Sequence, residues 1–317
     1  MSKIITVTLN PAIDHIIHID KFEQGEVIRA RQSSLVAAGK GINVARTISC
    51  LKKEVTAFCF VGNNEAYLFN QLGSEFYKIV LFPVDGPTRS NITVVEPNHK
   101  LITHLQTNGF ELSEVQLEPF TQQLGHFITS GDTVVLSGSV AKGVPDDYYK
   151  QLIAMCNGKG CRVVFDSSGI MLKKGIEAKP YVIKPNIAEL KELSGSNLPT
   201  LEEIIREAGK INEMGVELVF ISRGGEGVIL TRRGDAGYWT ANVQLPSGEH
   251  EGDEIGCGDS MIGGVALSIS GNYQTEDIIR MAVSCGAANI LSKGPGVCRP
   301  VDVESLFRQA EVRYHNK

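Results

Sequence analysis

The sequence lacks the features that tie a protein to a membrane, to secretion or to nucleic acid. No apolar run approaches the roughly 18 residues that a membrane-spanning helix requires. The N-terminus, MSKIITVTLNP, has neither the apolar core nor the cleavage site of a signal peptide. Basic residues form no block and the net charge is −5, so a polyanion-binding surface is not expected. We therefore expect a cytoplasmic protein with no membrane partner and no nucleic-acid partner.

The chain also lacks a cysteine pattern that would indicate a metal site or a disulfide framework. Its seven cysteines are odd in number and scattered, and Cys156 and Cys161 have no pair of histidines nearby. We expect reduced thiols packed as small hydrophobic side chains. The rest of the composition, 42% hydrophobic and 21% charged, is typical of a folded chain. Its 317 residues suit about two domains, or one α/β domain with an elaboration.

Beyond residue 114 the sequence alternates regularly between helix and strand patterns. The expected strands cover 133–139, 161–169, 181–186 and 217–227, and the expected helices cover 117–128, 146–156, 187–193 and 201–214. The apolar centres of these strands are nearly continuous, as in a parallel sheet covered on both faces. Each strand ends in small or polar residues, and in an open α/β sheet such ends form the ligand crevice.

The first hundred residues read differently. Strands are expected over 4–9 and 55–61, and helices over 43–51 and 66–72. At the other end of the chain, further helices are expected over about 259–270, 276–292 and 302–313. Residues 13–32 and 88–108 instead alternate as half-exposed strands, the first segment with short strands over 15–20 and 26–32, the second with a hairpin turn near 97–99. We expect these two segments to form a small β-sheet lid, or a dimer surface, on a main body of residues 1–12, 33–87 and 109–317.

The stretch from Gly252 to Leu267 carries the clearest chemical signal. Gly256, Cys257 and Gly258 form a glycine-spaced turn that leads through Asp259 into an apolar helix. Backbone N–H groups at a helix start bind negative charge, and a carboxylate on the first turn can take the proton of a hydroxyl held beside them. This layout suits phosphoryl transfer to an alcohol. On its spacing alone, the simpler interpretation is that Asp259 caps a buried helix.

A second informative stretch is AAGKGINVAR, residues 37–46, in which Gly39 and Gly41 flank Lys40. It is not a Walker loop, because the earlier glycine and the following Ser or Thr are missing, and Val44 breaks the GxGxxG pattern of a dinucleotide site. A glycine-bracketed lysine at a helix start suits an anionic or polyhydroxyl ligand, because the backbone can approach it closely. A plain strand-to-helix turn with a solvated lysine explains the residues equally well.

Eight short motifs run nearly from end to end of the chain: TLNPAID (8–14), AAGKGINVAR (37–46), TRSN (88–91), SGSVAKGVP (137–145), FDSSG (165–169), KPNIAEL (184–190), SRGGEGV (222–228) and GCGDSMIGG (256–264). In this order they resemble the PfkB/ribokinase family of carbohydrate kinases, in the branch of the bacterial 1-phosphofructokinases and tagatose-6-phosphate kinases. The resemblance implies a ribokinase-like α/β fold, with a central, mostly parallel sheet, helices on both of its faces and a small β-sheet lid.

The resemblance also implies roles for the motif residues. A sugar phosphate is held by Asp14, Gly39, Lys40, Asn43, Asn91, Ser137 and Ser139, with Arg29, Lys40 and Arg89 as the cations available for its phosphate. ATP is surrounded by Lys184, Asn186, Ser222, Gly224, Gly227 and Asn289, and Asn186 with Glu189 acts on Mg²⁺ mostly through water. Asp259 takes the proton of the substrate hydroxyl at an ordinary acidic pKa, while the N–H groups of residues 256–259 stabilise the transferring phosphoryl group. The lid is expected to form a homodimer contact.

The reaction implied in this way is phosphorylation of C6 of D-fructose 1-phosphate by Mg²⁺-ATP, with tagatose-6-phosphate kinase, suggested by Lys142, as the runner-up. Two departures from the family pattern, Cys257 and Glu254, leave open a non-catalytic sugar-phosphate sensor. Glu254 adds a negative charge near the phosphoryl path, which Arg223 is expected to offset. A nicotinamide-dependent dehydrogenase is disfavoured, because the first strand ends in a proline turn and not in GxGxxG.

Overall fold

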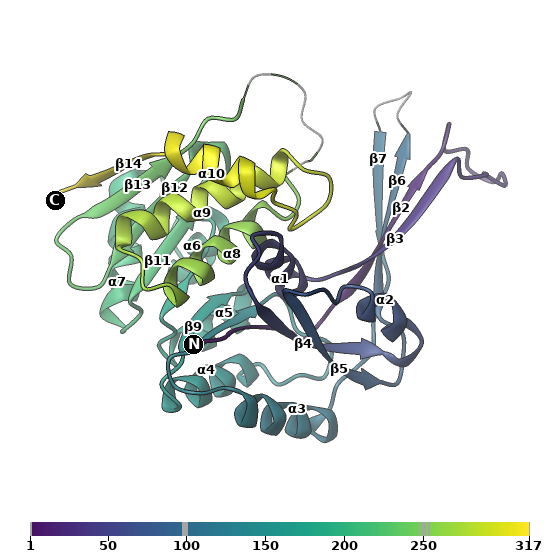
Figure 1. Ribbon diagram of the computed structural model, residues 1–317, viewed down its shortest axis with the longest axis horizontal. Helices are drawn as coiled ribbons and strands as arrows, with labels where there is room; N and C mark the ends of the chain where they lie inside the picture. Colours follow the sequence, from purple (N-terminus) through teal and green to yellow (C-terminus); the bar gives the residue numbers. More distant parts are fainter. Residues whose placement is uncertain (1, 97–100, 247, 249–251, 253, 317) are drawn as a thin grey trace.

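A ten-stranded sheet forms the centre of the molecule, in the order β14-β13-β12-β11-β10-β9-β8-β1-β4-β5 (Figure 1). The computed structural model describes residues 2–96, 101–246, 248, 252 and 254–316. The strands from β11 to β5 in this order run parallel, and β12, β13 and β14 extend one edge in antiparallel fashion. The strands are β1 (Ile4–Thr8), β4 (Val55–Gly62), β5 (Tyr77–Val84), β8 (Thr133–Ser137), β9 (Arg162–Asp166), β10 (Val182–Ile183), β11 (Leu218–Ser222), β12 (Val228–Arg232), β13 (Tyr238–Asn242) and β14 (Glu311–His315).

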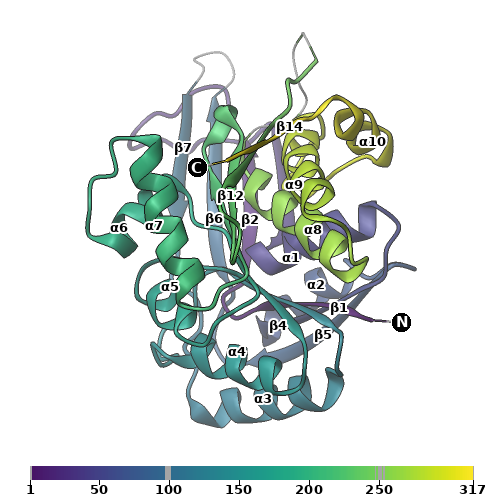
Figure 2. The same cartoon turned by 90° about the vertical axis from the view of Figure 1, so that its left-hand side faces the viewer.

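Helices cover both faces of this sheet (Figure 2). One face carries α1 (Lys40–Cys50), α2 (Ala66–Asn70), α8 (Cys257–Ser270) and α9 (Thr275–Ile290), with α10 (Pro300–Gln309) packed on α9. The other face carries α3 (Glu114–Phe127), α4 (Tyr148–Gly158), α5 (Gly169–Ile176), α6 (Ile187–Ser194) and α7 (Leu201–Glu213). Short 3₁₀ turns lie at Asn63–Glu65 and Gly224–Glu226. The two apolar layers confirm the α/β class expected from the nearly continuous strands.

A second, four-stranded sheet projects from the body at the upper right of Figure 1. It is formed by β2 (Ala12–His18), β3 (Gln32–Ala38), β6 (Arg89–Glu96) and β7 (Leu101–Gln106) in the order β3-β2-β6-β7. The strand expected over 26–32 is wrong, because β2 pairs along its whole length with residues 32–38. This sheet therefore includes residues that the sequence analysis placed in the main body. The hairpin turn expected near residues 97–99 lies outside the described residues.

Two further expectations differ from the structure, and two elements were missed. The helix expected over 302–313 ends at Gln309, because the chain then pairs with β13 as strand β14. Helix α1 begins at Lys40 instead of Asn43, since Gly39 is its N-cap and the helix starts directly against β1. Helix α5 and the β12–β13 hairpin were not expected. All seven cysteines are free, as expected. No helix in the described ranges combines the length and apolarity needed to cross a membrane.

Candidate active site

The turn before α8 is built around Gly256. This residue is the N-cap of the helix at φ 88°, and a Cβ placed on it would lie 2.7 Å from Pro295 Cα. Asn289 is buried and ties the turn down: its Nδ2 donates to the Ile255 carbonyl at 2.8 Å, and its Oδ1 accepts from the Gly296 N–H at 2.8 Å. In this structure Asn289 therefore holds the turn in place through its hydrogen bonds. The sequence analysis had expected it to contact the nucleotide.

The backbone N–H groups of residues 256–259, which were expected to face a phosphoryl group, are not all available to a ligand. The Cys257 N–H donates to the Glu254 carbonyl at 3.3 Å, so it is already engaged. As the second and third residues of α8, Gly258 and Asp259 have N–H groups with no partner inside the helix. Arg223, which was expected to offset the charge of Glu254, donates from Nη1 to Glu226 Oε2 at 3.1 Å within its own turn.

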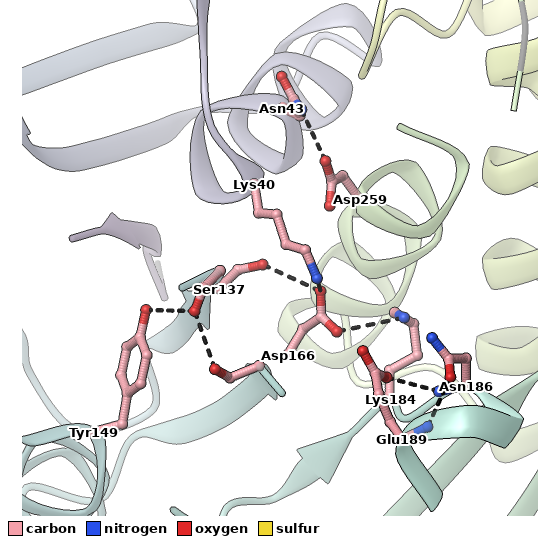
Figure 3. Close-up of polar contacts among 11 residues, drawn as sticks. Lys40, Asn43, Ser137, Tyr149, Asp166, Lys184, Asn186, Glu189 and Asp259 are labelled. Atoms are coloured by element: carbon pink, nitrogen blue, oxygen red, sulfur yellow. Dashed lines mark hydrogen bonds and ion pairs between the residues drawn. The ribbon is translucent and has the colours of Figure 1, made fainter. Parts of the chain in front are cut away.

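Asp259 is buried on the first turn of α8, and its environment is set by Asn43 of α1. Asn43 Nδ2 donates to Asp259 Oδ2 at 2.8 Å (Figure 3). Burial raises the pKa of Asp259 to about 6, because the hydrogen bond from Asn43 and the charge of Lys40 only partly offset the loss of hydration. The expectation of an ordinary acidic pKa is therefore wrong. A carboxylate that titrates near neutral pH is well matched to the work of a general base.

The amide of Asn43 is held in this orientation by Arg46, a residue that the sequence analysis missed. Arg46 donates to Asn43 Oδ1 at 3.1 Å, and also to the carbonyl of Ala37 at 2.8 Å. Its charge reaches Asp14 as well: burial raises the pKa of Asp14, and Arg46 is one of the groups that oppose the rise. The charge of Arg46 therefore acts on Asp14 of β2. Its hydrogen bond to Asn43 orients the amide that donates to Asp259.

The other groups expected to bind a sugar phosphate surround Asp14. Asn91 Nδ2 donates to Asp14 Oδ1 at 2.9 Å across the β2–β6 pair. The Arg89 guanidinium donates to the carbonyls of Pro11 and Asn10, at 3.2 Å each. Arg29 is exposed on the segment between β2 and β3, beyond the strand ends farthest from Asp14. The structure therefore brings Asn91 and Arg89 to Asp14 but leaves Arg29 apart.

The loop after β8 completes this side of the crevice. Ser139 is exposed, and its Oγ accepts from Asn10 Nδ2 at 3.1 Å. Ser137 is fully buried and donates to Asp166, so it supports the site without lining it. Between them Gly138 turns at φ 103°, with its carbonyl accepting from Tyr149 Oη at 3.1 Å. A Cβ on Gly138 would lie in ordinary contact with the Lys40 side chain, at 3.4 Å, so the positive φ and not the available space favours glycine here.

Lys40 and Lys184 share one buried carboxylate, that of Asp166 at the end of β9. Lys40 Nζ lies 3.2 Å from Asp166 Oδ2, and Lys184 Nζ lies 3.4 Å from Oδ1 (Figure 3). Burial alone would raise the pKa of Asp166, but the two ammonium groups outweigh it and hold that pKa below its ordinary value. Asp166 lies in the FDSSG motif, but the sequence analysis did not assign it to the site. Its position directly after an apolar strand was the available signal.

The residues expected around ATP gather at the carboxyl ends of β10 and β11. Asn186 and Ser222 form a bridge between these ends, and Gly224 and Gly227 follow in the next turn. Gly227 has φ 83°, and a Cβ there would lie 2.1 Å from the Ala241 carbonyl oxygen, so only glycine fits. A cavity of about 550 Å³ opens beside Asn186 and Ser222, within the range of about 300–1,000 Å³ that is usual for small-molecule sites.

Asn186 and Glu189 form the capping box of α6. Asn186 Oδ1 accepts from the Glu189 N–H at 2.9 Å, and Glu189 Oε2 accepts from the Asn186 N–H at 2.8 Å. One carboxylate oxygen of Glu189 remains for a cation, and the described residues contain no cluster of three or more His, Cys, Asp or Glu able to enclose one. This donor set suits Mg²⁺, which keeps several waters and is bound by one or two carboxylates together with substrate phosphates.

The profile of the pfkB family carbohydrate kinases matches residues 7–302. The 1-phosphofructokinase of Bacillus subtilis (strain 168) is 33% identical over 294 residues, which cover 92% of this chain and 94% of that protein. The crystal structure of phosphofructokinase-2 from Escherichia coli in complex with potassium superimposes with a TM-score of 0.89 at 26% identity, covering 97% of this chain and 99% of that one. The structure of Arabidopsis thaliana ribokinase complexed with ribose and ATP, at a TM-score of 0.76, 19% identity and 97% and 99% coverage, shares the fold.

Proposed function

The chain belongs to the pfkB family of carbohydrate kinases, and we propose that it is a 1-phosphofructokinase, which transfers the γ-phosphoryl group of ATP to the C6 hydroxyl of D-fructose 1-phosphate. The observation that carries this proposal is the buried Asp259 carboxylate, held by Asn43 at the start of α8. The choice of sugar phosphate rests on the similarity to the Bacillus subtilis 1-phosphofructokinase.

In the proposed mechanism Asp259 accepts the proton of the C6 hydroxyl as the oxygen attacks the γ-phosphorus, and the bond from this phosphorus to the bridging oxygen breaks so that ADP leaves. The N–H groups of Gly258 and Asp259, with the turn from Gly256 and Cys257 behind them, stabilise the charge on the phosphoryl oxygens. In a loose transition state the protein's main contributions are positioning and electrostatic stabilisation. A positioned base contributes about 10²–10⁴-fold.

The two substrates approach from opposite sides of this turn. Asp14 and Asn91 bind hydroxyls of the sugar, with Gly39, Asn43 and Ser139 around them, and Lys40 and Arg89 provide positive charge for its phosphate. Ser137 supports this side through Asp166, and Arg29 lies apart from it. Lys184, Asn186, Ser222, Gly224 and Gly227 surround ATP, and Asn289 acts through the turn that it holds. Glu189, with Asn186, would hold Mg²⁺ mainly through water, and the bound ion supplies neutralisation of the ATP phosphate charge.

Coupled measurement of ADP release tests the proposal directly. The acceptors are fructose 1-phosphate, tagatose 6-phosphate, fructose 6-phosphate and ribose, with ATP alone as the background. Fructose 1-phosphate is expected to give the highest kcat/KM. A preference for tagatose 6-phosphate would replace the proposed substrate with the alternative. Thermal stabilisation by fructose 1-phosphate without any ADP release would instead indicate a non-catalytic sensor.

The pKa of Asp259 gives a pH prediction. The base is active when ionised, so kcat/KM is expected to be constant above about pH 7 and to fall about tenfold per unit below pH 6. A plot of kcat/KM against pH measures this acid limb, the fall in rate below pH 6. Phosphate monoesters also titrate near pH 6, so phosphorus NMR of the free sugar phosphate supplies the control. A profile that stays flat down to pH 4.5, after correction for the substrate, would contradict the assignment of Asp259.

We also propose that the small sheet is a lid over the sugar and the contact of a homodimer. The strand register places Leu35, Ile92 and Leu105 on the face opposite to Asp14 and Asn91. Leu35 and Leu105 are 49% and 51% exposed. His15 lies between Leu35 and Ile92 in this row. Exposed apolar side chains gathered on one face of a sheet are typical of a protein–protein contact.

Substitution of Leu105 by aspartate is expected to dissociate the dimer into chains of 34.4 kDa. The symmetric contact would bury the new carboxylate twice, at a cost of about 2–5 kcal/mol each. Light scattering after size exclusion measures the mass, and Val115→Asp, on the exposed side of α3, is the control. An unchanged dimer in Leu105→Asp, or a monomeric wild type, would contradict the proposal.

A further inference from the structure

Asp166 is a fully buried carboxylate at the point where the two halves of the site meet. It ends β9, is 1% exposed, and lies beneath α1 and the residues that follow β10. Its Oδ2 faces Lys40 Nζ at 3.2 Å and the Ser137 hydroxyl at 3.4 Å, and its Oδ1 faces Lys184 Nζ at 3.4 Å. Each carboxylate oxygen therefore holds one ammonium group (Figure 3).

The two lysines come from opposite sides of the crevice. Lys40 begins α1 on the sugar side, and its charge interacts with Asp259 as well as with Asp166. Lys184 lies against the start of α8, where a Cβ added to Gly258 would be 3.6 Å from Lys184 Nζ. The two positive charges therefore flank the turn that carries Asp259. A lysine has a long flexible stem with high rotamer entropy, so a fixed position requires an anchor.

Resting on the proposed kinase function, we propose that Asp166 is the positioning residue of phosphoryl transfer: its two oxygens hold Lys40 and Lys184 on either side of the group in transit. The carboxylate itself touches neither substrate. Its negative charge pairs with the ammonium group of Lys184, which is only 7% exposed and would otherwise be a buried charge without compensation at this end of the site. Without the anchor, two like charges would repel each other across the site.

Neutralising Asp166 changes the electrostatic environment of the charged and titratable groups that face it. Lys40 comes from α1, Lys184 from the segment after β10, Asp259 from α8 and Tyr149 from α4, while Glu189 of α6 acts on Lys40 at longer range. Tyr149 is fully buried and stays protonated, since burial raises its pKa far above the ordinary value. The charge of Asp166 raises the pKa of Asp259. Neutralising Asp166 is therefore expected to move the acid limb of the pH–rate profile to lower pH.

Asp166→Asn keeps the shape of the side chain and removes its charge. We expect kcat to fall about 10²-fold, as for loss of a preorganised charge-stabilising group, with a smaller change in the KM of either substrate and with the acid limb shifted down. The matched control is Asp132→Asn. Asp132 is also 1% exposed and paired with a lysine, at 3.4 Å from Lys3, but it precedes β8, at the amino end of a strand whose carboxyl end faces the site. This control is expected to lose stability without any change in kcat or in the pH profile.

A double-mutant cycle separates positioning from folding. In a Lys40→Gln, Lys184→Gln background, which removes the like charges, Asp166→Asn is expected to cost less than threefold in kcat, because Asp166 acts through these lysines. An Asp166→Asn enzyme that loses stability like the control yet keeps kcat, KM and pH profile would overturn the proposal. So would an equal loss in kcat in both backgrounds. Wild-type ADP release with fructose 1-phosphate in the same assay reports separately on the proposed function.

Discussion

Replacing Asp259 with asparagine is expected to lower kcat about 10³-fold while leaving ATP binding nearly intact. Asparagine has the same shape and can still accept the hydrogen bond from Asn43, but it cannot take a proton from the sugar hydroxyl. A positioned base contributes about 10²–10⁴-fold, and the remaining turnover comes from the backbone donors and the lysines. Single-turnover ADP formation and calorimetric titration with ATP measure the two quantities.

The same variant is expected to be more stable than the wild type at neutral pH. The pKa of Asp259 is about 6 in the folded chain and near 3.8 in the unfolded chain, so folding disfavours the carboxylate. This destabilisation is fully present above pH 6 and vanishes below pH 4. At about 1.4 kcal/mol per unit it amounts to about 2–3 kcal/mol at most. A variant with substantial residual turnover and unchanged stability would contradict both the assignment of Asp259 as the base and the raised pKa of its carboxyl group.

Gly256→Ala is expected to have the second largest effect, a loss of about 10²–10³-fold in kcat. Gly256 has φ 88°, and the new methyl group would overlap Pro295 Cα, which lies 2.7 Å from the Cβ position. Since Pro295 is backbone-constrained, the turn must move, and with it the N–H groups of Gly258 and Asp259. Loss of one such donor typically costs 10²–10³-fold. Steady-state kinetics on the folded variant measure the loss.

The control for this substitution is Gly131→Ala. Gly131 has φ 86°, but a Cβ there meets no atom within 4 Å, and it lies between α3 and β8, away from the site. Both variants carry the cost of a left-handed alanine, about 1–2 kcal/mol, so they should lose similar stability from backbone strain. Only Gly256→Ala should lose turnover. Equal activity in the two variants would mean that the position of the amide turn does not matter for catalysis.

The parts of the site that could be predicted from the sequence are those that lie within one short stretch. Gly256 to Asp259 form a turn and a helix start from adjacent residues, and Asn186 with Glu189 form a capping box at a spacing of three. Such patterns depend on local geometry, which the sequence specifies directly. The parallel sheet could be predicted for a similar reason, because its strands are nearly continuous apolar runs.

What could not be predicted depends on contacts between distant residues. Asp166 meets Lys40 across 126 positions of the chain, and Asn43 meets Asp259 across 216. The raised pKa of Asp259 follows from this burial and not from its neighbours in sequence. In the same way the expected helix over 302–313 included the first residues of β14, which form a strand because they pair with the open edge of β13. Which edge a short terminal segment pairs with is not specified by its own residues.

A crystal structure with fructose 1-phosphate and a non-hydrolysable ATP analogue tests the central claim most directly. The account predicts that the C6 hydroxyl lies about 3 Å from an Asp259 carboxylate oxygen, with the γ-phosphate against the N–H groups of Gly258 and Asp259. It also predicts that Asp14 binds the same sugar. A sugar phosphate bound with its C6 hydroxyl turned away from Asp259, or a γ-phosphate held elsewhere, would contradict the account.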